Sequence, residues 1–115
     1  MKKERGIITL LTDFGTADSY VSAMKGVILS INPDATIIDI SHQIPPQDIT
    51  TGAFVLSQSA PFFPKGTVHI AVVDPGVGGK RKPILIQTDR YFFVGPDNGI
   101  FSLALQRERV KRKIH

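Results

Sequence analysis

Apolar residues along the chain form two kinds of pattern that alternate with each other. Continuous runs rich in β-branched residues are typical of strands buried on both faces of a sheet. They predict strands at residues 6–12, 35–41, 66–74, 82–89 and 90–95. Between these runs, apolar residues recur at helical spacing and predict helices at residues 18–30, 49–63 and 100–107. Pro61 is expected to halt the second helix.

Strands that alternate with helices predict an α/β fold, with a mainly parallel sheet flanked by helices and right-handed crossovers. Such sheets bind ligands at the carboxyl ends of their strands. Asp13 lies just past the first predicted strand, and Asp74 ends the third. We therefore expect both carboxylates at the same edge of the sheet.

The carboxyl-terminal segment fits the alternating pattern least well. No strand is predicted after the last helix, and the ending KRKIH contains no cap or stop signal. We therefore predict an α/β domain at residues 1–106 and, at residues 107–115, a basic tail or the start of a continuation. The tail holds five Lys/Arg and one Glu, which equals the whole net charge of +4. Because no aromatic residues are interleaved with these charges, a solvated end is favoured over a nucleic-acid site.

Length and composition narrow the class of protein. A chain of 115 residues with 42% hydrophobic residues fits one globular domain. The absence of cysteine excludes disulfides, thiolate metal sites and a cysteine nucleophile, and it suits a reducing cytoplasm. No apolar run approaches the roughly 20 residues of a membrane span. We predict a soluble, cytoplasmic protein with no membrane partner.

The stretch DPGVGGKRKP, residues 74–83, is rich in glycine and offers two interpretations. Its three glycines and Lys80 could cradle a phosphate. The spacing matches neither a dinucleotide-binding fingerprint nor a P-loop, and the next predicted element is a strand instead of a helix. A tight loop between two strands explains the glycines more simply. It does not explain why a carboxylate, Asp74, precedes them.

Three separated stretches together resemble the amino-terminal domain of the S-adenosylmethionine (SAM) hydroxide adenosyltransferase family. They lie at residues 10–49 (beginning LLTDFG), 62–84 (containing VVDPGVGGKRKP) and 93–102 (FVGPDNGIFS). The resemblance covers nearly all of residues 6–106. In that family, water or hydroxide attacks C5′ of SAM and gives adenosine and methionine, and halogenating relatives, the fluorinases and chlorinases, share the fold. The resemblance implies that SAM is a substrate, that no cofactor is needed, and that full-length members form homotrimers with active sites between subunits.

The resemblance also implies roles for individual residues. Asp74 and Arg81 match by their spacing the first two members of the family's water-handling set, and the third, a distant His, is not assigned to His115. Asp13 resembles the carboxylate that accepts hydrogen bonds from the ribose hydroxyls. Without the resemblance, a structural salt bridge between Asp74 and Arg81 and a turn aspartate at Asp13 would be simpler interpretations.

The remaining polar and aromatic residues are either further substrate-binding candidates or structural residues. The candidate substrate-binding residues are Asp13, Phe14, Asp18 and Asp74. Phe14 would supply apolar contact and Asp18 would meet polar groups, although either could simply pack or cap the next helix. The other polar residues that we considered have structural interpretations. His42 and His69 lack metal-ligand spacing and are expected to be structural histidines with satisfied hydrogen bonds, and Asp97 and Asn98 are expected in a turn. We predict no metal.

The charge of Asp74 indicates whether water or a halide is the nucleophile. Asp74 stands where halogenating relatives carry a neutral residue, and a carboxylate repels a halide. At about 4 Å and an effective dielectric near 20, the repulsion is roughly 4 kcal/mol, or about a thousandfold in occupancy. We therefore expect water as the nucleophile and SAM hydrolysis as the activity, although the isolated 115-residue chain is expected to have little. A non-catalytic adenosine- or SAM-binding domain, or a scaffold domain, is the alternative.

Overall fold

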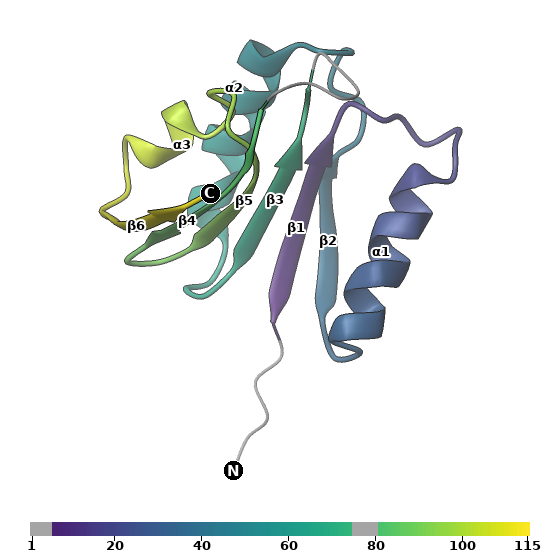
Figure 1. The fold of residues 1–115 in the computed structure, drawn as a ribbon, viewed down its shortest axis with the longest axis horizontal. Helices are drawn as coiled ribbons and strands as arrows, with labels where there is room; N and C mark the ends of the chain where they lie inside the picture. Colours follow the sequence, from purple (N-terminus) through teal and green to yellow (C-terminus); the bar gives the residue numbers. More distant parts are fainter. Residues whose placement is uncertain (1–5, 75–80) are drawn as a thin grey trace.

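Six strands form one sheet in the order β2-β1-β3-β5-β4-β6 in the computed structural model, which describes residues 6–74 and 81–115 (Figure 1). The neighbours β2-β1, β1-β3 and β3-β5 are parallel, whereas β4 runs antiparallel to both β5 and β6. The predicted α/β fold with a mainly parallel sheet is confirmed. The strands are β1 (Ile7–Thr12), β2 (Thr36–Ser41), β3 (Val68–Val72), β4 (Pro83–Thr88), β5 (Phe92–Pro96) and β6 (Val110–Ile114).

Helices lie on both faces of this sheet (Figure 1). They are α1 (Tyr20–Ile31), α2 (Ile49–Ser59), the 3-10 turn η1 (Ala60–Phe62) and α3 (Ser102–Leu105). Pro61 lies in the first turn of η1, so the α-helix predicted at residues 49–63 ends just before that proline and continues as a 3-10 turn. The carboxyl ends of β1 and β3 meet at the upper edge in Figure 1, and the amino terminus lies at the opposite end.

The core lies between the sheet and the helices α2 and α3. Its members are apolar side chains that are less than a tenth exposed, among them Leu11, Leu56, Ala71, Val73 and Phe93. Gly52 of α2 fits tightly here, since an added Cβ would approach Ile100 Cδ1 to 2.8 Å. α1 on the other face buries no residue fully. The buried apolar cluster therefore includes residues of α2 and none of α1.

The carboxyl-terminal segment contains a strand that the sequence pattern did not predict. Residues 110–114 form β6, which pairs antiparallel with β4 from Thr88↔Val110 to Leu85↔Ile114. The predicted helix at residues 100–107 shortens to the four residues of α3. The Glu108 side chain, only 3% exposed, explains the change, because it forms an ion pair with Arg90 and accepts a hydrogen bond from Thr88 Oγ1 at 2.8 Å. These contacts tie the chain to the β4–β5 hairpin just before β6 begins.

His69 lies on β3 with no exposed surface. Its Nδ1 is 2.7 Å from Thr9 Oγ1 on β1, and the rings of Phe63, Tyr91 and Phe93 surround it at centroid distances of 4.7 to 5.6 Å. Its Nε2 has no hydrogen-bond partner within the described part of the chain. Burial lowers the pKa of His69 to about 4, although the nearby Glu108 opposes this shift. His69 therefore lies in the core as a structural residue would, but the prediction that its hydrogen bonds are satisfied holds for Nδ1 and not for Nε2 among the described residues.

We expect acid to destabilise the protein through His69. The imidazole titrates near 6.5 when unfolded and near 4 when folded, so the unfolded state binds the proton first as the pH falls. The stabilisation is present above pH 6.5 and is lost progressively towards pH 4. Between about pH 7 and about pH 4.5, the free energy of unfolding should fall by about 2.5 kcal/mol from this group alone. Urea denaturation at several pH values measures the change.

The matched control is His69→Asn, because an amide can still bond to Thr9 but does not titrate in this range. The variant is expected to be less stable at neutral pH and to lose less stability on acidification. Parallel pH profiles of the two proteins would show that His69 does not carry the acid sensitivity.

Candidate functional site

The carboxyl ends of β1 and β3 bring two candidate carboxylates to one edge of the sheet. The strands are parallel neighbours in which Thr12 lies opposite Val72. The Asp13 backbone N–H donates to the Val72 carbonyl at 3.4 Å, so the chain just past β1 is still joined to β3. Asp74 follows two residues after Val72 on the same side. The expectation that Asp13 and Asp74 share this edge is confirmed.

Asp13 is half-buried, and one of its carboxylate oxygens is held by the backbone. Its Oδ2 accepts a hydrogen bond from the Gln47 N–H at 2.7 Å. Gln47 has a φ of 65°, a left-handed conformation that turns its N–H towards Asp13 at the entrance to α2. No described group is hydrogen-bonded to the second oxygen, Oδ1. A carboxylate fixed through one oxygen can accept hydroxyl hydrogen bonds through the other.

A chain of polar side chains fixes the loop around Asp13 from the β2 side. Thr12 Oγ1 accepts from the Phe14 N–H at 3.2 Å and lies 2.7 Å from Nδ1 of His42. The second nitrogen of His42 is 2.8 Å from Asp39, which also pairs with Lys25 at 2.8 Å. Burial alone would raise the pKa of Asp39, but hydrogen bonds from Lys25 and His42 lower it below its usual value. His42 is therefore a structural histidine with both nitrogens paired, as predicted.

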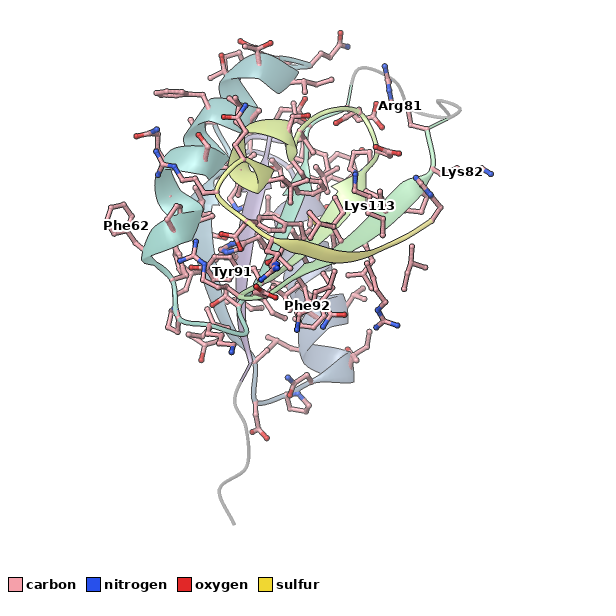
Figure 2. The ribbon with its side chains drawn as sticks, turned by 90° about the vertical axis from the view of Figure 1, so that its left-hand side faces the viewer. Phe62, Arg81, Lys82, Tyr91, Phe92 and Lys113 are labelled. Carbon is pink, nitrogen blue, oxygen red and sulfur yellow. The ribbon has the colours of Figure 1, made fainter. Side chains whose placement is uncertain are left out.

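Asp74 and Arg81 contact each other across the loop that joins β3 to β4. Arg81 Nη1 donates to Asp74 Oδ1 at 3.2 Å, with side chains that are 40% and 26% exposed respectively. Figure 2 shows Arg81 and Lys82 where the described chain resumes before β4. The salt bridge that was the simpler interpretation of these two residues is present. The glycines and Lys80 of the phosphate-cradle interpretation lie outside the described residues.

Phe14 and Asp18 lie in the loop between β1 and α1 but in different surroundings. The Phe14 ring is 5.9 Å from that of Tyr20, and both line an apolar hollow of about 460 Å³ between α1 and Ile70 of β3. Asp18 is exposed, and the N-cap of α1 is Ser19, whose side chain makes no capping hydrogen bond. The structure therefore places Phe14 beside the site and gives Asp18 no described contact with Asp13 or Asp74.

Asn98 is a residue that the sequence pattern assigned only to a turn. The turn is present, because Asn98 Oδ1 accepts from the Ile100 N–H at 3.1 Å. Its Nδ2 also donates to the Val73 carbonyl at 2.7 Å, directly before Asp74. A long-range contact of this kind has no local signal in the sequence.

Metal sites and membrane spans are two other features that the described residues could form. Across residues 6–74 and 81–115, no group of three or more His, Asp or Glu side chains could hold a metal ion. None of the described helices is long and apolar enough to cross a membrane.

The arrangement has two chemical capacities at one edge of the sheet. Asp13 presents a carboxylate oxygen to hydroxyl groups. Asp74 presents a carboxylate beside the permanent positive charge of Arg81, and this combination can orient a polar nucleophile and favour its deprotonated form. The Asp13 and Asp74 side chains are both partly exposed, so a small molecule can reach them.

Comparison with known proteins gives the family. The SAM hydroxide adenosyltransferase N-terminal domain model matches residues 8–115. The (R)-S-adenosyl-L-methionine hydrolase of Methanocaldococcus jannaschii is 54% identical over 113 residues, covering 94% of this chain and 43% of that protein. The fluorinase of Actinoplanes sp. is 27% identical over 123 residues, covering 87% of this chain and 41% of that protein.

A solved structure supports the same relationship. The crystal structure of a conserved hypothetical protein from Thermus thermophilus aligns with a TM-score of 0.87 and 40% identity, covering 96% of this chain and 46% of that one. The chain thus spans less than half the length of these relatives. It belongs to the SAM hydroxide adenosyltransferase family and corresponds to the amino-terminal domain.

Proposed function

We propose that the full-length protein hydrolyses SAM to adenosine and methionine. The observation that carries this proposal is the Asp74–Arg81 ion pair at the sheet edge that also holds Asp13. The name of the Methanocaldococcus jannaschii relative, 54% identical, supports SAM as the substrate. Phe14 is assigned apolar contact with the substrate, and Asp18 is assigned to its polar groups.

The proposed reaction needs an oriented water and little else. Asp74 holds the water in line with C5′ and accepts one of its protons, while Arg81 stabilises the resulting hydroxide charge. The new bond joins the water oxygen to C5′, and the C5′–S bond breaks with its electron pair going to sulfur. Sulfur leaves as the neutral thioether of methionine, so no general acid is required. Asp13 positions C5′ by accepting hydrogen bonds from the ribose hydroxyls. The proposal includes no metal or cofactor.

Charge favours water over halide at this site. A halide within about 4 Å of the Asp74 carboxylate would be repelled by roughly 4 kcal/mol at an effective dielectric near 20. Arg81 offsets part of this repulsion, but it already donates to Asp74 Oδ1. The chain is 54% identical to a SAM hydrolase and 27% identical to a fluorinase, and this difference supports assignment to the hydrolases.

For the full-length protein, we also propose that it is a homotrimer and that it acts in the cytoplasm. Large apolar side chains exposed on α1 are consistent with further packing: Tyr20 is 63% exposed, Val27 62% and Ile31 81%. A trimer with sites between subunits would add groups that this chain does not supply. We therefore expect the isolated 115-residue chain to turn over slowly or not at all.

The test is product formation in labelled water. In H₂¹⁸O, the full-length protein should release adenosine and methionine in equal amounts, with the label in the 5′-hydroxyl of adenosine, because attack at C5′ transfers the water oxygen there. Liquid chromatography with mass spectrometry measures both products. SAM or adenosine binding without turnover would instead support the non-catalytic binding domain, and unlabelled adenosine would exclude attack by water at C5′.

A further inference from the structure

The turn between β5 and α3 holds the β3–β4 loop at both of its ends. On one side, Asn98 Nδ2 donates to the Val73 carbonyl at 2.7 Å, directly before Asp74. On the other, the Asp97 backbone N–H donates to the Lys82 carbonyl at 2.9 Å, directly after Arg81. Two consecutive residues of one turn thus contact the chain beside each member of the ion pair.

The Asn98 side chain is fixed at both ends of its amide. Its Oδ1 accepts from the Ile100 N–H at 3.1 Å while its Nδ2 donates to Val73. Asn98 is half-buried, and Ile100 is fully buried against Gly52 in the core. The amide is therefore anchored to a rigid part of the molecule, and this anchor sets the position of the Val73 carbonyl.

The Val73 carbonyl controls the direction of Asp74 because the peptide group is planar. This carbonyl and the N–H of Asp74 belong to one peptide unit, so fixing the oxygen fixes the plane from which the Asp74 side chain departs. The ion pair itself cannot do this, since both side chains are partly exposed and such pairs contribute about 1 kcal/mol or less. The hydrogen bond from Asn98 to the Val73 carbonyl adds a constraint on the backbone that the ion pair does not supply.

We propose that Asn98 is a positioning residue that orients the Asp74–Arg81 pair for attack on SAM. The proposal rests on the proposed function for its consequence in turnover, whereas the geometric role of Asn98 can be tested without turnover. A turn-only role would require the Ile100 contact and nothing more.

Asn98→Asp separates these two roles. The carboxylate has nearly the shape of the amide and can still accept from the Ile100 N–H, so the turn is kept. It cannot donate, and it places a negative oxygen against the Val73 carbonyl. The matched control is Asn32→Asp at the end of α1, where Asn32 Oδ1 accepts from the Asp34 N–H at 3.2 Å.

In the full-length protein, Asn98→Asp is expected to lower kcat for SAM at least about tenfold while KM changes less than about threefold. The reason is that Asp13, which binds the ribose in the proposed reaction, is held by Gln47 and not by Asn98. Asn32→Asp should leave both constants unchanged. Equal activity of Asn98→Asp and wild type, or a rise in KM that accounts for the whole effect, would overturn the proposal.

A double-mutant cycle tests whether Asn98 acts through Asp74. If it does, adding Asn98→Asp to Asp74→Asn should lower kcat by less than about twofold, because the group being positioned is already lost. A full multiplication of the two effects would overturn the proposal, since it would show that Asn98 acts independently.

Backbone amide NMR tests the geometry even if SAM is not hydrolysed. Asn98→Asp should shift the amide resonance of Asp74, whose N–H shares a peptide unit with the Val73 carbonyl, while the Ile100 N–H stays protected from hydrogen exchange. A shifted Asp74 resonance in a protein that never releases adenosine would retain the positioning role and reject the proposed function. An unchanged Asp74 resonance would reject the positioning role itself.

Discussion

Asp74→Asn in the full-length protein is expected to lower kcat for SAM hydrolysis at least about a hundredfold, with little change in KM. The amide has the size of the carboxylate and still accepts a hydrogen bond from Arg81, so the fold and the binding of SAM should persist. It cannot take a proton from water, and it no longer carries the charge that holds water against Arg81. Steady-state kinetics of adenosine release measures both constants.

Asp13→Asn is the control that separates a loss of substrate binding from a loss of water activation. It should mainly raise KM, because Asp13 is assigned to the ribose and is anchored separately by the Gln47 N–H. A pattern in which both variants raise KM and spare kcat would contradict the assignment of water handling to Asp74. So would an Asp74→Asn protein with nearly normal kcat.

The edge that carries the candidate site could be predicted from the sequence because it depends on local pattern. Buried β-branched runs indicated parallel strands, and parallel strands place their carboxyl ends together. Asp13 and Asp74 therefore had to lie at one edge. A salt bridge between Asp74 and Arg81 was one interpretation of their sequence, but spacing across a loop does not determine which side chains meet, and their catalytic role was inferred only from resemblance.

Other parts of the fold depend on contacts between residues far apart in the chain. β6 has charged residues at its three central positions, 111–113, and such a segment by itself favours solvent. Lysines are nevertheless common on edge strands, where they discourage pairing with other chains. The buried Glu108 and its partners on the β4–β5 hairpin bring the segment to the sheet. Asn98 was likewise assigned a turn, but its contact with Val73 spans 25 positions.

Gly95→Ala is expected to destabilise the protein by at least about 3 kcal/mol, a large part of the roughly 5 to 15 kcal/mol that holds an ordinary protein folded. A Cβ at this position of β5 would lie 2.2 Å from the Ala71 carbonyl oxygen and 3.1 Å from Phe101 Cζ. The first contact is with backbone, so it cannot be relieved by rotating a side chain. Circular dichroism and urea denaturation measure the loss.

Gly26→Ala provides the matched control, because the same methyl group is added where nothing lies within 4 Å. Gly26 is in the exposed helix α1, where alanine is favoured over glycine by about 0.5 to 1 kcal/mol, so this variant should be more stable than wild type. The opposite signs would show that the close approach of β5 to β3 requires glycine at position 95.

Ala71 lies three residues before Asp74, so any partly folded Gly95→Ala protein should also lose the alignment of β3 with the turn that holds Val73. A Gly95→Ala protein with normal stability would show that β3 and β5 can separate without cost, and the rigid frame assumed for the Asp74–Arg81 pair would then be wrong.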